Sequence, residues 1–160
     1  MTVALAELET QVTGAEASVR PLRFPQDFEP FLAHLKVLYP SIGEDVLRRR
    51  FDRVQAEGWK CIGTFTFGDG DPAMMIAMCG FWIQHRFCYG RDLYVDHFIV
   101  ADADRGRGVS SQLWESLEQI ARDNGCERIV LDTFVTNSRA QRFWMNRGCQ
   151  IVGLHFGKPL

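Results

Sequence analysis

The sequence lacks the cysteine and histidine patterns that mark metal sites and disulfide frameworks. Its five cysteines are scattered and odd in number, no CxxC pair occurs, and its four histidines form no HExxH motif. We therefore expect no bound metal. The cysteine pattern fits free thiols in a reducing compartment, which predicts a cytoplasmic protein.

Long hydrophobic runs and a strong net charge are also missing. No apolar stretch approaches the roughly 20 residues that a membrane-spanning helix requires, and the acidic N-terminal segment does not resemble a secretory signal. The chain has 18 basic and 20 acidic residues, a net charge of −2. We therefore expect no membrane partner and no nucleic-acid partner.

The composition that is present favours a globular chain. Apolar residues make up 46% of the 160 residues and aromatic residues 12%, which predicts a packed core rather than disorder. The length fits one domain. We predict an N-terminal arm over 1–17, loose or forming a short amphipathic helix, and a single domain over 18–160.

Hydrophobic periodicity and turn residues predict an α+β (mixed α/β) domain of the order β-αα-βββ-α-β-α-β. The expected helices lie near 25–39, 43–58, 109–125 and 137–148. The expected strands lie near 18–24, 59–68, 72–87, 93–101, 127–135 and 149–160. In the third helix, an apolar stripe of Val109, Leu113, Leu117, Ile120 and Ala121 is expected to face the core.

The segment ADADRGRGVS, residues 101–110, places two arginines and two glycines between an expected strand and an expected helix. A glycine-rich turn at a helix N-terminus is suited to binding an anion, because the first N–H groups lack intrahelical partners. The third glycine of the Rossmann pattern is replaced by Ser111, and the Walker GK[ST] is absent. A single copy within an ordered pattern is also unlike an RNA-binding RGG tract.

The spacing Arg105-x-x-Gly108-x-Ser110 resembles the coenzyme A pyrophosphate loop of the GNAT superfamily of N-acetyltransferases, with Ser110 in place of the usual Gly or Ala. Further along, the segment from Asn137 through Phe143-Trp144 to Gly148 resembles a second GNAT motif. The resemblance implies a central mixed, mostly antiparallel sheet flanked by helices, and transfer of an acetyl or other short acyl group from acetyl-CoA.

The resemblance also implies which residues bind coenzyme A. Backbone N–H groups of the loop are expected to hold the pyrophosphate, and the strand before it to bond the pantetheine. Asn137 is expected to bond the pantetheine or to cap its helix. The expected coenzyme A residues are Phe98, Ile99, Val100, Arg105, Gly106, Arg107, Gly108, Val109, Ser110, Asn137, Phe143 and Trp144.

The implied chemistry is attack of an amine on a thioester, which requires a base to take the amine proton. Asp96 and His97 are both candidates for the base, and both also have structural alternatives. Strict alternation would place Tyr94 and Asp96 on one side of the strand and His97 on the other. Relatives often carry a bulge in this strand, so the sequence leaves the choice open.

Trp144 stands where many relatives carry a tyrosine that protonates the departing thiolate. An indole N–H donates a hydrogen bond but is not an acid near neutral pH. Tyr94 or Tyr89 could substitute, the thiolate could leave without an acid, or the chain could be a non-catalytic acyl-CoA-binding module. Cys149, where relatives have Phe, is expected to pack in the core.

The acceptor is the least defined part of the sequence. A small-molecule amine is the first expectation, with a protein, tRNA-bound or carrier-bound amine as the alternative. The aromatic run with Trp82, His85, Phe87, Tyr89 and Tyr94 could line an acceptor pocket or belong to the sheet core. The sequence leaves a homodimer open.

Overall fold

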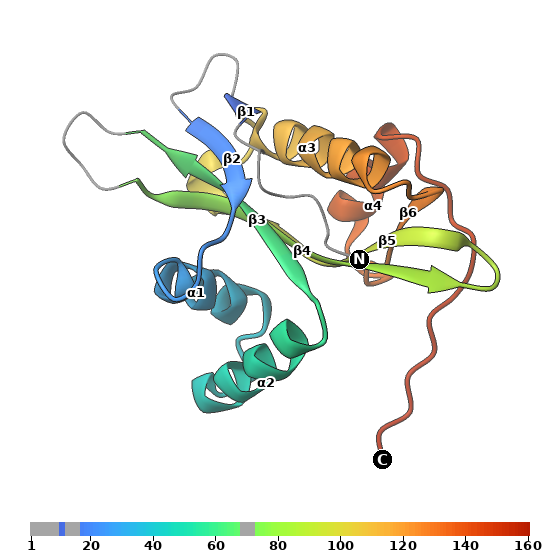
Figure 1. Ribbon diagram of the computed structural model, residues 1–160, viewed down its shortest axis with the longest axis horizontal. Coiled ribbons are helices and arrows are strands. Elements are labelled where there is room, and N and C mark those ends of the chain that lie inside the picture. Colours follow the sequence, from blue (N-terminus) through green and yellow to red (C-terminus); the bar gives the residue numbers. More distant parts are fainter. Residues whose placement is uncertain (1–9, 12–16, 68–72) are drawn as a thin grey trace. The chain divides into compact units, whose positions relative to one another are not determined.

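The computed structural model describes residues 10–11, 17–67 and 73–160. The chain divides into a first unit over 1–130 and a second unit over 131–160 (Figure 1). The strands are β1 (Thr10–Gln11), β2 (Ala17–Pro21), β3 (Lys60–Thr66), β4 (Met75–Arg86), β5 (Gly90–Val100) and β6 (Arg128–Leu131). The helices are α1 (Phe28–Leu38), α2 (Glu44–Ala56), the 3-10 turn η1 (Asp102–Asp104), α3 (Val109–Asp123) and α4 (Ser138–Asn146).

The described strands form one sheet in the order β1-β2-β3-β4-β5-β6. The pairs from β1 to β5 are antiparallel, and the long β4–β5 hairpin is its centre. The backbone N–H of Glu127, just before β6, bonds to the carbonyl of Arg91 in β5 at 2.7 Å. The mostly antiparallel sheet that the sequence predicts is confirmed.

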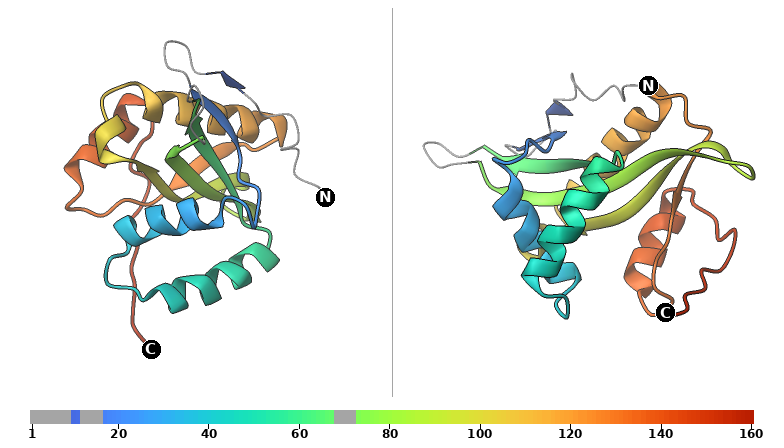
Figure 2. Two further views of the ribbon diagram at one scale, coloured as in Figure 1. Left: turned by 90° about the vertical axis from the view of Figure 1, so that its left-hand side faces the viewer. Right: turned by 60° about the horizontal axis from the view of Figure 1, so that its bottom comes forward.

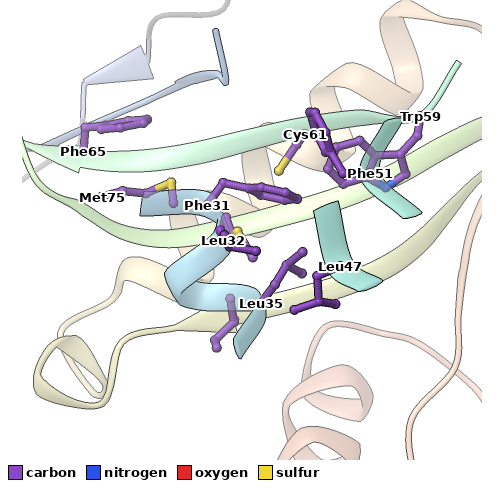
Figure 3. Packing of buried hydrophobic residues seen from close by; sticks show 11 residues of the cluster. Phe31, Leu32, Leu35, Leu47, Phe51, Trp59, Cys61, Phe65 and Met75 are labelled. Carbon is purple, nitrogen blue, oxygen red and sulfur yellow. The ribbon is translucent and has the colours of Figure 1, made fainter. Parts of the chain in front are cut away.

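One face of the sheet is covered by α1 and α2 (Figure 2). Apolar residues at helical spacing, including Phe31, Leu32 and Leu35 of α1, form the side of the helices that packs on the sheet. Helix α1 ends at Leu38, and its cap residue Tyr39 directly precedes Pro40. Figure 3 shows their packing against side chains of α2, β3 and β4. The buried cluster is Phe31, Leu32, Leu35, Leu47, Phe51, Trp59, Cys61, Phe65, Met75, Met78 and Ile99.

The opposite face of the sheet is covered by α3 (Figure 1). Its predicted apolar stripe is confirmed, since Val109, Leu113, Leu117, Ile120 and Ala121 are all buried. Burying this stripe is the main contribution of the helix to stability, because an isolated helix of this length is marginal in water.

A β-bulge interrupts β5 at Asp96. Gly80 of β4 pairs with His97, whereas the next residue, Phe81, pairs with Val95. Consecutive residues of β4 point to opposite faces, so Val95 and His97 also point to opposite faces, although they are two residues apart. Asp96 is the extra residue of the bulge, and simple alternation therefore fails at this point.

The second unit holds α4, which begins after Asn137 and ends at Arg147, before Gly148 with φ 82°. The Asn137 side chain accepts a hydrogen bond from the Ala140 N–H at 3.1 Å, so its predicted capping role is confirmed. The unit also exposes several large apolar side chains, among them Phe134, Val135 and Ile151.

The α+β class and the expected elements up to α4 are confirmed, but the last expected strand is not formed. Residues 149–160 have neither helix nor strand. Gly153, Gly157 and Pro159 interrupt this segment, and glycine and proline weaken strands. Of the expected N-terminal arm, Thr10–Gln11 forms a strand paired with β2 and Ala17 is the first residue of β2, whereas 1–9 and 12–16 lie outside the described residues.

Candidate functional site

The loop after β5 has an open backbone. Gly106 and Gly108 have φ values of +80° and +85°, a left-handed conformation that glycine adopts without strain. A Cβ atom added at either glycine would meet no atom within 4 Å, so space adjoins both positions. The loop therefore offers room for a ligand to approach the backbone closely.

The N-terminus of α3 lies directly after this loop. Gly108 is its N-cap residue, and among the described residues no side chain caps the helix. The Gly108 carbonyl accepts the N–H groups of Ser111 and Gln112, but the earlier N–H groups of the first turn have no intrahelical acceptor. An uncapped helix terminus beside two open glycines fits a pyrophosphate group.

The two arginines of the loop pair with acids of the preceding turn. Arg107 lies 2.9 Å from the buried Asp104, and Arg105 pairs with Asp102 while its Nε donates to the Val100 carbonyl at 3.3 Å. Each arginine is thus largely balanced by a neighbouring carboxylate. What the loop offers to an anion is therefore mainly its backbone N–H groups.

The bulge in β5 places Asp96 and His97 in different environments. The side chain of Asp96 is 42% exposed, whereas that of His97 is 4% exposed. The His97 Nδ1 lies 3.3 Å from the Asp96 Oδ2. The pair therefore presents its carboxylate to solvent and keeps its imidazole behind it.

Aromatic rings from α1 and β3 enclose the His97 imidazole. Phe31 lies 6.2 Å from it between ring centroids, and Trp59, just before β3, lies 5.5 Å from it. Gly80, opposite His97 in β4, has no side chain at the point where these rings meet. The position of His97 thus depends on three segments far apart in the sequence.

Tyr39, at the C-terminal end of α1, lies within the electrostatic reach of Asp96, which the sequence did not reveal. Burial raises its pKa above the ordinary value of 10.0, and the negative charge of Asp96 raises it further. The hydroxyl therefore stays protonated at neutral pH and lies within the field of the Asp96 carboxylate. In the sequence, the position of Tyr39 before Pro40 indicates only the end of a helix and gives no sign of a chemical role.

The aromatic run of β4 and the hairpin turn does not gather into one pocket. Trp82 packs against the buried cluster, Phe87 is fully exposed, and Tyr89 lies between the guanidinium groups of Arg86 and Arg128 at 4.8 and 4.6 Å. Tyr94 pairs with Trp82 and so faces the same side as His97. Of this run, Tyr94 and Trp82 thus share a face with the predicted site.

The buried cysteines beneath the bulge are not suited to nucleophilic chemistry. Burial raises the pKa of Cys61 and of Cys79, and the Asp96 charge adds to the effect at both thiols. Because the thiolate is the reactive form, both remain inert thiols. The acyl group is therefore not expected to pass through a cysteine at this site.

A separate cavity of about 520 Å³ opens between the start of α1 and one side of α2. Its lining residues are Phe24, Pro25, Phe28, Arg48, Phe51, Asp52 and Gln55. The lining contains none of the residues that the sequence predicts for the site.

The described side chains contain no group of three acidic, histidine or cysteine residues placed to hold a metal ion. No described helix is long and apolar enough to cross a membrane.

The remaining predicted coenzyme A residues lie in the second unit. Asn137 uses its side-chain oxygen as the cap of α4. Phe143 and Trp144 stack edge to face at 4.7 Å between centroids, and Trp144 is buried. Cys149, expected in the core, is half-buried. These contacts describe α4 by itself.

Comparison with known proteins adds a family match over most of the chain. A family model described as the acetyltransferase (GNAT) family matches residues 30–149. The chain is also 27% identical over 149 residues to glucosamine 6-phosphate N-acetyltransferase 1 of Oryza sativa subsp. japonica, and the match covers 89% of both chains.

Solved structures with the same fold include two N-acetyltransferases. The structure of AAC(6')-Iy in complex with the bisubstrate analog CoA-S-monomethyl-acetylneamine matches with a TM-score of 0.75 and 19% identity, over 91% of this chain and 99% of that chain. Glucosamine-6-phosphate N-acetyltransferase from Arabidopsis thaliana matches with a TM-score of 0.69 and 19% identity, over 89% and 97%. At these identities the likeness concerns the fold.

Proposed function

The chain belongs to the acetyltransferase (GNAT) family, and from this premise we propose that it acetylates the primary amine of an amino sugar or a similar small molecule, with Asp96 as the base. As a member of this family, the chain is an acyl-CoA-dependent N-acetyltransferase. The observation that carries the proposal is the layout of β5. An exposed carboxylate lies at its bulge, and an open glycine loop leading into an uncapped helix N-terminus follows its end.

Asp96 suits the role of base better than His97. A base must reach the proton that it takes, and Asp96 is the exposed member of the pair. Its carboxylate takes a proton from the substrate ammonium group, directly or through one water molecule, and so frees the amine lone pair for attack. His97, held behind it, donates a hydrogen bond to the carboxylate and orients it.

The loop and β5 hold the acyl donor. The backbone N–H groups from Arg105 to Ser110 bind the pyrophosphate, and the backbone of Phe98, Ile99 and Val100 binds the pantetheine. Asn137, Phe143 and Trp144 are further proposed contacts to coenzyme A. Acetyl-CoA supplies an activated acetyl thioester, whose carbon the amine attacks while the carbon–sulfur bond breaks and the thiolate leaves.

A proton for the leaving thiolate does not come from Trp144, because an indole is not an acid at neutral pH. Tyr94 faces the same side as His97, and Tyr39 carries a protonated hydroxyl near Asp96. These two tyrosines are the proposed alternatives to the tyrosine that position 144 lacks.

The acceptor class rests on the comparisons. The relative from Oryza sativa is named for glucosamine 6-phosphate and matches 89% of the chain, and the AAC(6')-Iy complex holds an acetylneamine derivative. We therefore propose an amino-sugar acceptor, with glucosamine 6-phosphate and neamine as the first two probes. Turnover confined to a peptide or a tRNA-bound amine would contradict this proposal.

The test combines turnover with a change at the proposed base. Coenzyme A release from acetyl-CoA is measured with each probe amine for the unaltered protein and for Asp96→Asn. We expect kcat to fall on the order of 100-fold or more while the KM for acetyl-CoA stays unchanged. Asp123→Asn, at the exposed end of α3, is the matched control and keeps its activity. Full activity of Asp96→Asn would exclude Asp96 as the base.

We also propose a homodimer in the cytoplasm. In the second unit, the tail side chains Ile151, Leu154 and Phe156 are 75%, 75% and 86% exposed, and apolar groups in such numbers favour a covering surface. A second copy of the chain is the proposed cover. Sedimentation should show a dimer for the unaltered protein and a monomer for Leu154→Asp. A monomer in both would contradict the dimer. The cytoplasmic location stays a prediction from the cysteine pattern.

A further inference from the structure

The hydrogen bond between His97 and Asp96 defines the protonation of the His97 ring. A carboxylate only accepts hydrogen bonds, so Nδ1, at 3.3 Å from the Asp96 Oδ2, carries the ring proton and donates it. In the neutral ring the other nitrogen, Nε2, then holds a lone pair and acts as an acceptor. This acceptor lies on the buried side of the imidazole.

Two buried nitrogen atoms in this region have no hydrogen-bond partner among the described residues. They are Nε2 of His97 and Nε1 of Trp59. Trp59 is 3% exposed and its indole nitrogen only donates, whereas Nε2 of a neutral His97 ring with its proton on Nδ1 accepts. A buried polar group without a partner costs about 1–3 kcal/mol, so two complementary groups in one place indicate a shared ligand.

Gly80 brings the two rings together. A Cβ atom at Gly80 would lie 2.7 Å from the His97 Nε2 and 2.5 Å from the Trp59 Cζ2. The ring planes are inclined by 36° at a centroid distance of 5.5 Å, a tilted arrangement. The two nitrogen atoms do not bond to each other, since neither has a partner among the described residues. One water molecule, which both donates and accepts, can bridge them.

We propose that Trp59 is a positioning residue of the acceptor site, whose indole N–H binds an internal water molecule that donates to the His97 Nε2. The water keeps the proton of His97 on Nδ1, and the Nδ1–H orients the Asp96 carboxylate. The proposal rests on the proposed function in one respect, that Asp96 takes the amine proton. Around this group, the titratable side chains within the field of Asp96 include Tyr39 at the end of α1, Cys61 of β3 and Cys79 of β4.

The test removes the indole N–H and keeps an aromatic ring. In Trp59→Phe we expect the ¹⁵N shifts of the His97 ring to report a mixture of tautomers, where the unaltered protein shows the Nδ1–H form. We expect kcat with acetyl-CoA and glucosamine 6-phosphate to fall about 10-fold, the effect of one hydrogen bond, at unchanged KM for acetyl-CoA. An unchanged tautomer and kcat would reduce Trp59 to a packing role.

Two controls accompany this variant. Trp114→Phe removes a comparably buried indole on α3, whose N–H donates to Glu118 at 2.8 Å, and should change neither readout. The ring of His34, bonded to the Pro30 carbonyl at 2.9 Å, serves as a reference in every spectrum.

A measurement on the unaltered protein covers the case in which Trp59→Phe does not fold. The Trp59 indole proton should show a cross-peak to a long-lived water molecule, and its absence would overturn the proposal. The tautomer and water readouts do not depend on turnover. If Asp96 is not the base, Asp96→Asn keeps full activity, and this outcome can be distinguished from a failure of the Trp59 proposal.

Discussion

The two parts of the proposed site, the bulge within β5 and the loop that follows it, are built in opposite ways. At the end of the strand, the loop with Gly106 and Gly108 uses open backbone and needs little from the rest of the chain. In the middle, the bulge at Asp96 uses side chains, and His97 is fixed by Trp59 and Phe31 from other elements. A local sequence can therefore specify the first part, whereas the second part exists only in the folded chain.

The largest expected effect tests the backbone part. Gly108→Glu places a Cβ atom at positive φ and a negative charge at the α3 N-terminus, where both oppose a pyrophosphate. We expect the Kd for coenzyme A, measured by calorimetry, to rise on the order of 100-fold.

Gly125→Glu is the matched control at the other end of the same helix. Gly125 has a φ of 64° and also has nothing within 4 Å of an added Cβ atom. A glutamate at position 125 has the same backbone strain but does not lie at the N-terminus of α3, so the affinity for coenzyme A should stay unchanged. Equal loss in both variants would show that strain, and not the anion site, accounts for the effect.

The second prediction tests the side-chain part. Gly80→Ala forces a Cβ atom to within 2.4 Å of the His97 ring and 2.5 Å of the Trp59 ring, and neither buried ring can easily move. We expect a loss of about 1–3 kcal/mol in the free energy of unfolding, measured by urea denaturation, together with lower kcat.

Gly106→Ala is the counterpart in the loop. Its Cβ atom meets open space, so only the positive φ is unfavourable, at about 1 kcal/mol. If Gly106→Ala cost more stability than Gly80→Ala, the contrast between an open loop and a packed bulge would be wrong.

The third prediction concerns an ion pair outside both parts. Asp27, before α1, accepts two hydrogen bonds from Arg20 of β2, at 2.7 and 2.9 Å. Burial is the largest influence and raises its pKa, but the Arg20 hydrogen bond, the Arg23 N–H and the charges of both arginines outweigh it, so the pKa is lowered. An acid whose pKa is lower in the folded than in the unfolded state stabilises the fold at pH values above its unfolded-state pKa. This stabilisation is lost as the pH falls through the folded-state pKa.

We accordingly expect Asp27→Asn to lose about 2 kcal/mol of unfolding free energy at pH 7. The difference from the unaltered protein should shrink as urea curves are recorded at successively lower pH, below the ordinary pKa of 3.8. Asp45→Asn breaks the exposed pair with Arg49, at 2.8 Å, and should lose far less stability than Asp27→Asn, because solvent screens an exposed ion pair. Coenzyme A affinity should not change in either variant.

The smallest effect is expected from the arginines that make the loop conspicuous. Because Arg105 and Arg107 pair with Asp102 and Asp104, Arg105→Gln and Arg107→Gln should each change the Kd for coenzyme A less than about 3-fold at physiological salt. A much larger change that fades at high salt would show that their charge, and not the backbone, binds the anion.

The difference between the two parts also explains what the sequence could predict. The loop spacing from Arg105 to Ser110, the apolar stripe of α3 and the Asn137 cap are local patterns, and the helix start, the buried stripe and the cap are all found. Whether the loop and α4 bind coenzyme A stays a prediction. The α+β class follows from the same local periodicity.

The acceptor side could not be predicted in the same way. The bulge follows from the pairing of Gly80 with His97 and of Phe81 with Val95, which no single strand reveals. The role proposed for Tyr39 follows from its proximity to Asp96, which only the folded chain reveals. The closing strand at 149–160 was expected from apolar alternation alone, but a strand forms only where another strand pairs with it.

The bulge has a consequence for moving this site into another protein. Because β5 carries one residue more than its partner stretch, the two halves of the hairpin are out of phase by one position. Transplanting β5 alone into a regular sheet would turn either Tyr94 or His97 to the wrong side. The smallest portable unit is therefore the hairpin from Met75 to Val100 with Gly80 and Asp96 kept together, and deleting Asp96 would restore a regular ladder while removing the carboxylate.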